Sequence, residues 1–321
     1  MPSPEGKLLT EFMYRFSNFN PVENPDITGK FRKLNRIAVK NAYCPKGFVL
    51  SRESTASGTR YERITKAGAV RNHKLILYFH GGAYQAGLLY FYKDFAPDFY
   101  RESGGAEIIY LDYRLAPEFQ YPVQLREALD LWQDLTEHQG YQPEDIILGG
   151  DSAGGNLVLA MMLWLRDHDQ KLPKAGFCIS PWANMAGESE TAISNYGKDV
   201  EFGQPGKIMT EEISKILHDS DIYAWLSEKD RQENRQNPYI SPVFGNYQNF
   251  PPMLFTAGSD EMLLGDTLTL VRKFKKLRIP VRCDIQPEMC HIYPVFRHFS
   301  PESSHSYWCI LNFIRRISEI S

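Results

Sequence analysis

The sequence predicts an α/β protein built on a mainly parallel sheet. Short apolar runs alternate with helical patterns along most of the 321 residues, and this alternation is typical of a parallel sheet covered by helices. Turns rich in glycine follow several of the apolar runs, as they do where a strand gives way to a helix. Residues 183–235 interrupt the alternation with polar sequence. We therefore expect one α/β domain that carries an insertion.

The N-terminal part differs from the alternating region. Apolar residues recur at helical spacing on both sides of Asn24-Pro25, which predicts two short amphipathic helices. Residues 46–72 contain an apolar run followed by turn residues, and we interpret them as an antiparallel hairpin at the sheet edge. The sequence thus predicts a helical segment over residues 1–45 and an α/β domain over residues 46–321.

Apolar runs and helical patterns place the other elements. Further strands are predicted at residues 75–79, 107–111, 146–148, 175–180, 252–258 and 281–285. Helices are predicted at residues 91–101, 123–139, 157–166, 268–277 and 307–317, and in the insertion at 211–217 and 222–226.

The chemistry of the chain is predicted from Gly150-x-Ser152-x-Gly154. This pattern lies between a predicted strand and a predicted helix, which is the context of a nucleophile elbow. Any side chain two residues before or after the serine would collide with neighbouring backbone, so glycine fits both positions. Taken alone, the pattern is equally compatible with a glycine-rich turn that binds phosphate, and the rest of the chain decides between the two.

A serine nucleophile needs a base, and the elbow context predicts the chain order serine, acid, histidine. Among the histidines after the elbow, His291 leaves a predicted strand directly. Because ligands of α/β sheets gather at the carboxyl ends of strands, His291 is the predicted base. His298 and His305 are the alternatives.

Two adjacent carboxylates, Asp260 and Glu261, follow the preceding predicted strand. One of them can orient the histidine, while the other can favour the N-terminal end of the next helix. Composition does not choose between them.

The developing oxyanion needs N–H donors. Ala153 directly follows the serine, and Gly81 and Gly82 lie in a His-Gly-Gly-Ala loop after the strand at 75–79. Gly81, Gly82 and Ala153 are therefore the predicted oxyanion hole, and His80 is expected to hold the loop.

Taken together, these motifs resemble the hormone-sensitive-lipase-like carboxylesterases of the α/β-hydrolase fold. The resemblance covers roughly residues 45–320 and implies an eight-stranded sheet with helices on both faces. It also implies a helical cap made of N-terminal helices and an insertion after the sixth strand, which residues 1–45 and 183–235 fit. The motifs that carry it are His80-Gly81-Gly82-Ala83, Asp112-Tyr113-Arg114-Leu115-Ala116-Pro117-Glu118, Gly150-Asp151-Ser152-Ala153-Gly154-Gly155, Ser180-Pro181-Trp182, Glu261 and His291.

The chain departs from the family pattern in three places. The family acid is usually aspartate with leucine two positions later, and Leu263 stands two positions after Glu261. Some similar members carry glutamate, and the resemblance therefore favours Glu261, whereas counting from the strand end favours Asp260. Ala83 replaces a frequent third glycine, and Ile292-Tyr293 replaces a frequent Gly-Phe pair after the histidine.

The resemblance implies a serine carboxylesterase that works through an acyl-enzyme and needs no cofactor and no metal. Bulky apolar residues in the cap segments are expected to narrow the site, so short-chain acyl esters are the predicted substrates. Ala83, Tyr84 and Trp182 are expected to contact the substrate. An amidase or peptidase using the same triad, and a non-catalytic small-ligand receptor of this fold, are the alternatives.

Composition excludes several other classes of function. The net charge is −3 without a long basic run, which argues against nucleic acid as a partner. The five cysteines form no C-x-x-C pair, so reduced thiols in a cytoplasmic protein are expected. No stretch of about 18 apolar residues predicts a membrane span. A small-molecule ester is the expected partner, and the sequence leaves a homodimer open.

Overall fold

The computed structural model describes residues 1–38, 43–187 and 189–320. At its centre lies one eight-stranded sheet in the order β1-β2-β4-β3-β5-β6-β7-β8. β2 pairs antiparallel with β1 and β4, whereas the other neighbours are parallel. The predicted α/β fold with a mainly parallel sheet is therefore confirmed. Residues 39–42 of the predicted N-terminal segment and residue 188 of the predicted insertion lie outside the described residues.

The edge hairpin is formed by β1 and β2, and all the predicted strands are present. The strands are β1 Phe48–Ser54, β2 Arg60–Lys66, β3 Leu75–Phe79, β4 Glu107–Leu111, β5 Ile146–Asp151, β6 Ala175–Ile179, β7 Met253–Gly258 and β8 Val281–Gln286.

Most of the helices lie where the sequence predicts them, although several begin earlier. The α-helices are α1 Pro4–Phe16, α2 Ile27–Ala38, α3 Ala96–Glu102, α4 Val123–Gln133, α5 Ala153–Asp167, α6 Glu190–Ser194, α7 Glu211–Asp219, α8 Glu228–Glu233, α9 Leu264–Lys276 and α10 Pro301–Glu319. The helix predicted at residues 222–226 is wrong, because only a short 3-10 turn, Asp221–Tyr223, forms there.

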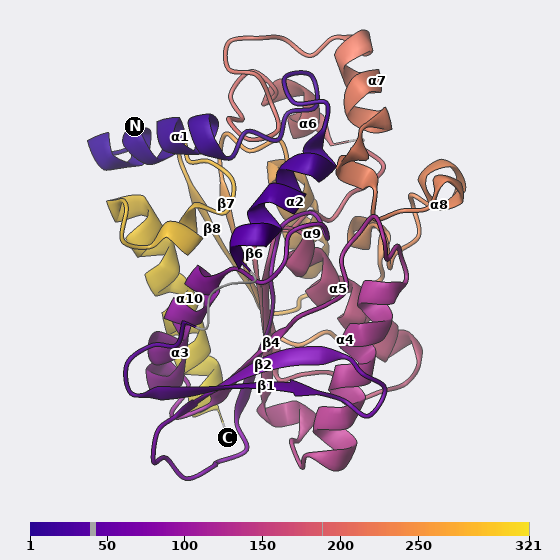
Figure 1. Cartoon of the computed structure of the whole chain (residues 1–321). Helices are drawn as coiled ribbons and strands as arrows, with labels where there is room; N and C mark the ends of the chain where they lie inside the picture. The colour runs from indigo at the N-terminus through magenta and orange to yellow at the C-terminus, as the bar shows by residue number, and fades with distance from the viewer. Residues whose placement is uncertain (39–42, 188, 321) are drawn as a thin grey trace.

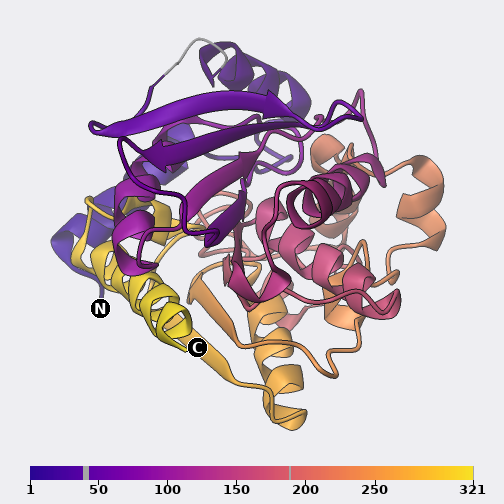
Figure 2. The same cartoon turned by 90° about the horizontal axis from the view of Figure 1, so that it is seen from below.

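The period-two alternation of β3 divides the apolar core between the two faces of the sheet. Leu75, Leu77 and Phe79 belong to the cluster that includes residues of α4, α5 and α9, whereas Ile76 and Tyr78 belong to the cluster that includes residues of α3 and α10. Helices thus cover both faces, as the family resemblance implies. Figure 2 shows α10 on the opposite side of the sheet from α4 and α5.

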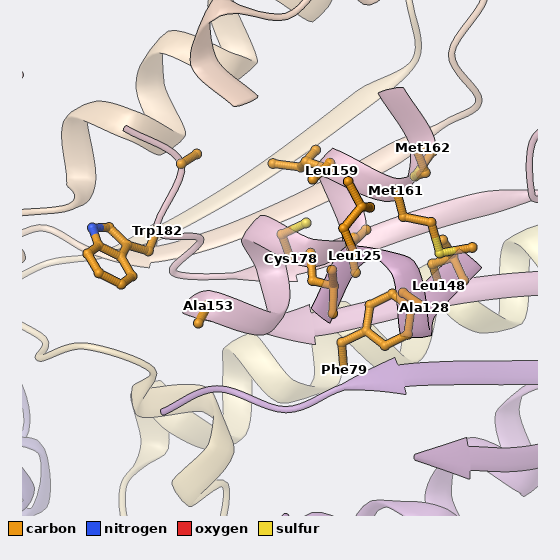
Figure 3. Packing of buried hydrophobic residues seen from close by; sticks show 14 of the residues in the cluster. Phe79, Leu125, Ala128, Leu148, Ala153, Leu159, Met161, Met162, Cys178 and Trp182 are labelled. Atoms are coloured by element: carbon orange, nitrogen blue, oxygen red, sulfur yellow. The ribbon is translucent and has the colours of Figure 1, made fainter. Parts of the chain in front are cut away.

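The first of these clusters surrounds the helix that follows the elbow. Figure 3 shows Phe79 of β3, Leu148 of β5 and Met161 of α5 packed together. These residues are fully buried, so the start of α5 is held rigidly against the sheet. The apolar interior thereby fixes the position of the turn between β5 and α5.

The N-terminal helices and the helices of residues 183–235 lie on the same side of the molecule. In Figure 1, α1, α2, α6 and α7 gather above the strands. Thr28 at the start of α2 donates its backbone N–H to Asp221 of the insertion at 2.8 Å, so the two segments are in contact. Among the described residues, no helix is long and apolar enough to cross a membrane.

Candidate active site

Ser152 occupies the turn between β5 and α5 with a strained backbone, at φ 51° and ψ −118°. A Cβ atom at Gly150 would lie 2.5 Å from the carbonyl oxygen of Gly154. A Cβ atom at Gly154 would lie 1.9 Å from the carbonyl oxygen of Phe79. Both distances are too short for any side chain, which is the physical reason for the glycines that the sequence motif contains. The turn has the geometry of a nucleophile elbow.

The loop after β3 is fixed by buried hydrogen bonds. The N–H of Gly81 donates to Asp151 Oδ1 at 3.0 Å, and the hydroxyl groups of Tyr78 and Tyr92 donate to the same carboxylate at 2.9 and 2.8 Å. His80 is fully buried and stacks on Tyr113 with ring centroids 4.2 Å apart. The ring of His80 therefore belongs to the support of the loop.

The bond from Gly81 to Asp151 does not fit the prediction that Gly81 donates to an oxyanion. The N–H groups of Gly82, Ala83 and Ala153, in contrast, have no hydrogen-bond partner within the described part of the chain. Gly82 and Ala83 adopt φ values of 104° and 53°. In this conformation successive N–H groups of the loop can converge on one anion, as in an anion-binding nest.

His291 lies after β8 and contacts Glu261, which lies after β7. His291 Nδ1 is 2.8 Å from Glu261 Oε2, and the two side chains are 3% and 0% exposed. Asp260, the other predicted acid, accepts a hydrogen bond from the hydroxyl of its neighbour Ser259 at 3.2 Å and has no bond to His291 in the described structure. Neither carboxylate caps α9, whose N-cap residue is Leu263.

Burial disfavours the charged imidazolium, but the acidic groups around His291 have the larger combined effect. The hydrogen bond and charge of Glu261, together with the charges of Glu201 and Asp199, raise the pKa of His291 to about 9. Nε2 of His291 is buried and has no hydrogen-bond partner among the described residues. It is therefore the ring nitrogen that remains available to a hydroxyl group in the site.

Ser180, at the end of β6, joins the acid to the histidine segment. Its hydroxyl donates to Glu261 Oε1 at 2.7 Å and accepts the N–H of Ile292 at 3.1 Å. Ser180 holds a positive φ of 46°, which a non-glycine residue adopts at some energetic cost. The sequence motif Ser180-Pro181-Trp182 contains this residue, but the motif alone does not reveal its contact with Glu261.

A loop of the insertion supports the acid from the other side. Asn195 Nδ2 donates to the carbonyl oxygen of Glu261 at 2.9 Å, and Asp199 Oδ2 accepts the N–H of Met262 at 2.7 Å. The ring of Phe202 meets that of His291 at 71°, with centroids 5.0 Å apart. Sequence reasoning missed these residues, because nothing in the polar insertion marks them by period or motif.

Ser152 and His291 line one cavity of about 160 Å³. Gly82, Ala83 and Trp182 lie in its wall, so two of the three predicted substrate contacts border it. Tyr84 does not line it; this side chain is 1% exposed and donates its hydroxyl to Asn156 at 2.7 Å. Other parts of the wall come from the N-terminal segment and the insertion. The residues of these two segments include Phe19, Pro21, Phe31, Glu201, Phe202, Leu217, Ile222 and Tyr223.

The alternative histidines lie elsewhere. His298 and His305 are exposed residues near and within α10, and neither lines the cavity. His305 Nε2 is 3.8 Å from Asp284 of β8. Of the three predicted histidines, the structure brings only His291 to the cavity beside Ser152.

Comparison with known proteins supports the same family. A family model described as alpha/beta hydrolase fold matches residues 76–295. An acetyl-hydrolase from Streptomyces hygroscopicus is 29% identical over 234 residues, which are 73% of each chain. An esterase from Acinetobacter venetianus is 30% identical over 250 residues, covering 78% of this chain and 77% of the relative.

A solved structure extends the similarity to the whole fold. It is an esterase of the bacterial hormone-sensitive lipase family, 27% identical, with a TM-score of 0.80 and 99% coverage of both chains. The family match, the esterase relatives and this structure agree with the elbow and cavity described above. The chain therefore belongs to the α/β-hydrolase family, among its hormone-sensitive-lipase-like carboxylic ester hydrolases.

Proposed function

We propose that this esterase hydrolyses short-chain acyl esters with Ser152 as nucleophile, His291 as base and Glu261 as the acid that orients the base. The observation that carries the proposal is the position of His291. Its Nδ1 is held by Glu261 at 2.8 Å, while the ring lines the cavity that Ser152 also lines. A histidine fixed at one ring nitrogen presents the other to the nucleophile, as in serine hydrolases.

The reaction proceeds in two stages. Nε2 of His291 takes the proton from Ser152 Oγ as the oxygen attacks the ester carbonyl carbon, and the tetrahedral intermediate forms. The same proton then passes to the alcohol oxygen as the carbon–oxygen bond breaks, which leaves the acyl group on Ser152. Water then attacks the acyl-enzyme as His291 takes one of its protons. The carboxylic acid product leaves when His291 returns this proton to Ser152 Oγ.

We infer that the oxyanion accepts hydrogen bonds from the N–H groups of Gly82, Ala83 and Ala153. Gly81 is excluded because its N–H donates to Asp151. Ala153 is the first residue of α5, so the positive end of the helix dipole adds to its effect. Loss of one such donor costs roughly 3 kcal/mol of transition-state stabilisation.

The size of the cavity supports short acyl chains. Its volume is about 160 Å³, and cavities of about 150 Å³ admit a molecule the size of benzene. The rings of Phe19, Phe31, Trp182 and Phe202 stand in its wall, so a longer chain meets bulky side chains. One relative is named an acetyl-hydrolase, which agrees with a small acyl group.

We further propose that residues 1–45 and 183–235 together form the cap of this site. Phe19 and Phe31 come from the first segment, and Phe202, Leu217 and Ile222 come from the second. Residues from both segments line the cavity, so neither segment alone makes its wall.

The proposal is tested with Ser152→Ala and a series of p-nitrophenyl esters of rising acyl length. We expect kcat/KM to be highest at roughly two to six acyl carbons and the variant to lose about 10⁴-fold or more of the activity while keeping its melting temperature. An anilide of the preferred acyl group tests the amidase alternative. Near wild-type turnover by Ser152→Ala, or a maximum at long chains, contradicts the proposal.

A further inference from the structure

One acidic side chain in the cavity wall forms no hydrogen bond with the proposed catalytic residues in the described structure. Glu201 lies in the insertion, is 3% exposed and lines the cavity together with Ser152 and His291. Its Oε1 atom is buried without a hydrogen-bond partner in the described structure. A buried carboxyl group in this situation is costly, because it has lost its hydration and gained no partner.

The surrounding backbone holds Glu201 in place. Asp199 Oδ1 accepts the N–H groups of Glu201 and Phe202 at 2.8 and 2.9 Å, and the carbonyl oxygen of Glu201 accepts the N–H of Phe19 at 2.6 Å. The segment is thus anchored on both sides. These bonds fix the main chain from which the Glu201 side chain lines the cavity.

The nearest cations do not satisfy the carboxyl group. Lys30 is close enough to affect its charge, but the ammonium group of Lys30 contacts the carbonyl oxygen of Asn18 and lies 4.8 Å above the Phe19 ring. Within the described residues the ion pair of His291 is with Glu261, and Glu201 takes part in none. Burial raises the pKa of Glu201 well above its usual range, against the opposing charge of His291.

We propose that Glu201 is a specificity-determining residue that accepts a hydrogen bond from a donor, a hydroxyl or an ammonium group, on the substrate ester. This inference rests on the proposed function, since it places the substrate in the same cavity. The cavity wall also contains apolar side chains, among them Phe19, Phe202 and Leu217. A substrate group that carries a donor would find in Glu201 an acceptor without a hydrogen-bond partner among the described residues.

Such a contact discriminates strongly between similar esters. A hydrogen bond to a charged or buried acceptor changes affinity by roughly 10- to 100-fold. A site built around a polar contact also rejects the analogue that lacks the donor, because its own polar group is then left unpaired.

The test compares isosteric pairs in which a hydroxyl replaces a methyl group. On the acyl side the pair is p-nitrophenyl 3-hydroxybutyrate and p-nitrophenyl 3-methylbutyrate, with p-nitrophenyl 3-aminobutyrate as the ammonium arm. On the alcohol side the pair is 2-hydroxyethyl acetate and propyl acetate. We expect the wild-type protein to favour the donor by roughly 10- to 100-fold in kcat/KM within at least one pair, and that pair identifies the side of the ester that meets Glu201.

The matching variant is Glu201→Met, which keeps the side-chain length and removes the acceptor. We expect the ratio within the preferred pair to fall toward one and kcat/KM on the methyl analogue to rise, because the apolar group no longer lies against an unpaired carboxyl. Glu233→Met, at an exposed position of α8, is the control and should keep the wild-type ratio. Equal rates within every pair in the wild-type protein overturn the inference without any variant, so the test can fail even if Glu201→Met is unstable.

The outcomes separate this inference from the proposed function. Equal rates within every pair, or a ratio that survives in Glu201→Met, overturn the role of Glu201 while ester hydrolysis stands. A role of Glu201 confined to the charge on His291 would change both members of a pair equally and leave their ratio unaltered, which also overturns the inference. Failure to hydrolyse any of the esters overturns the proposed function and the inference with it.

Discussion

At the scale of single residues, the acid–histidine pair dominates the electrostatics of the site. Glu261 contacts His291 at 2.8 Å in a buried environment, and the charges of Glu201 and Asp199 raise the pKa of His291 further. All three favour the imidazolium form. Because a protonated histidine cannot accept the proton of Ser152, these carboxylates set the lowest pH at which the proposed base can work.

This arrangement predicts the pH dependence of kcat/KM. Activity should rise with pH through the pKa of His291, which is raised above its ordinary value to about 9. Glu261→Gln removes the largest favourable charge, so the acid limb should move to lower pH while the maximal rate falls by roughly 10⁴-fold. The measurement is kcat/KM from pH 5 to 10 on a short aryl ester.

Asp260→Asn is the matched control for this experiment. Asp260 has no described bond to His291, so its variant should keep both the wild-type limb and nearly the wild-type rate. If the acid limb shifts in Asp260→Asn, or does not shift in Glu261→Gln, the assignment of Glu261 as the triad acid is wrong.

Sequence motifs predict which residues gather at this site better than they predict which atoms meet. Ser152 lies in the elbow, and Glu261 and His291 follow the ends of strands. Topology alone therefore brings the three residues to one edge of the sheet. The bond between Gly81 and Asp151 depends on the direction of one N–H group, which the His-Gly-Gly motif does not encode. Ser180 lies in a recognised motif, but the motif does not show that its hydroxyl contacts Glu261 across the fold. No local pattern marks Glu201.

At the scale of elements, the junction of β5 and α5 tolerates the least change. Gly154 is the second residue of α5, and the helix packs so closely on β3 that a methyl group would overlap the backbone of Phe79. The strand–turn–helix pattern was predictable because steric exclusion acts locally. The short helices α6 and α8 were not, since five and six residues carry too little periodicity to be recognised.

We expect Gly154→Ala to destabilise the protein by about 3 kcal/mol or more and to lower its melting temperature. Gly87→Ala is the control, because a Cβ atom there would stand 3.7 Å from its nearest neighbours, an ordinary contact distance. Thermal unfolding followed by circular dichroism compares the two. Equal melting temperatures would mean that β3 and α5 can separate, contrary to their close packing.

At the scale of the whole molecule, two segments far apart in sequence share the wall of one cavity. Phe19 and Phe31 stack with ring centroids 4.6 Å apart, and the insertion supplies the facing residues. The helical pattern predicted α1 and α2, but periodicity alone could not predict that Phe31 of α2 would line the same cavity as Ser152. The position of α2 depends on long-range contacts such as the bond between Thr28 and Asp221.

If these segments limit the acyl chain, removal of one ring should lengthen the accepted substrate. We expect Phe19→Ala to raise kcat/KM on esters longer than six carbons relative to the acetate, by roughly fourfold for each methylene that the new space admits. Leu8→Ala, at a site 61% exposed on α1, should leave the profile unchanged. An unaltered profile in Phe19→Ala would place the limit on chain length elsewhere.

The contact between the N-terminal helix and α10 has a consequence for how the protein is made. Ser3 donates its hydroxyl to Glu302 at 2.8 Å, and the helix that it caps precedes Phe19 and Phe31 of the cavity wall. During translation the ribosome synthesises these aromatic residues long before His291 and Glu302. The contact between Ser3 and Glu302 can therefore form only after residue 302 has been synthesised, and the proposed hydrolysis can begin only after His291 has emerged.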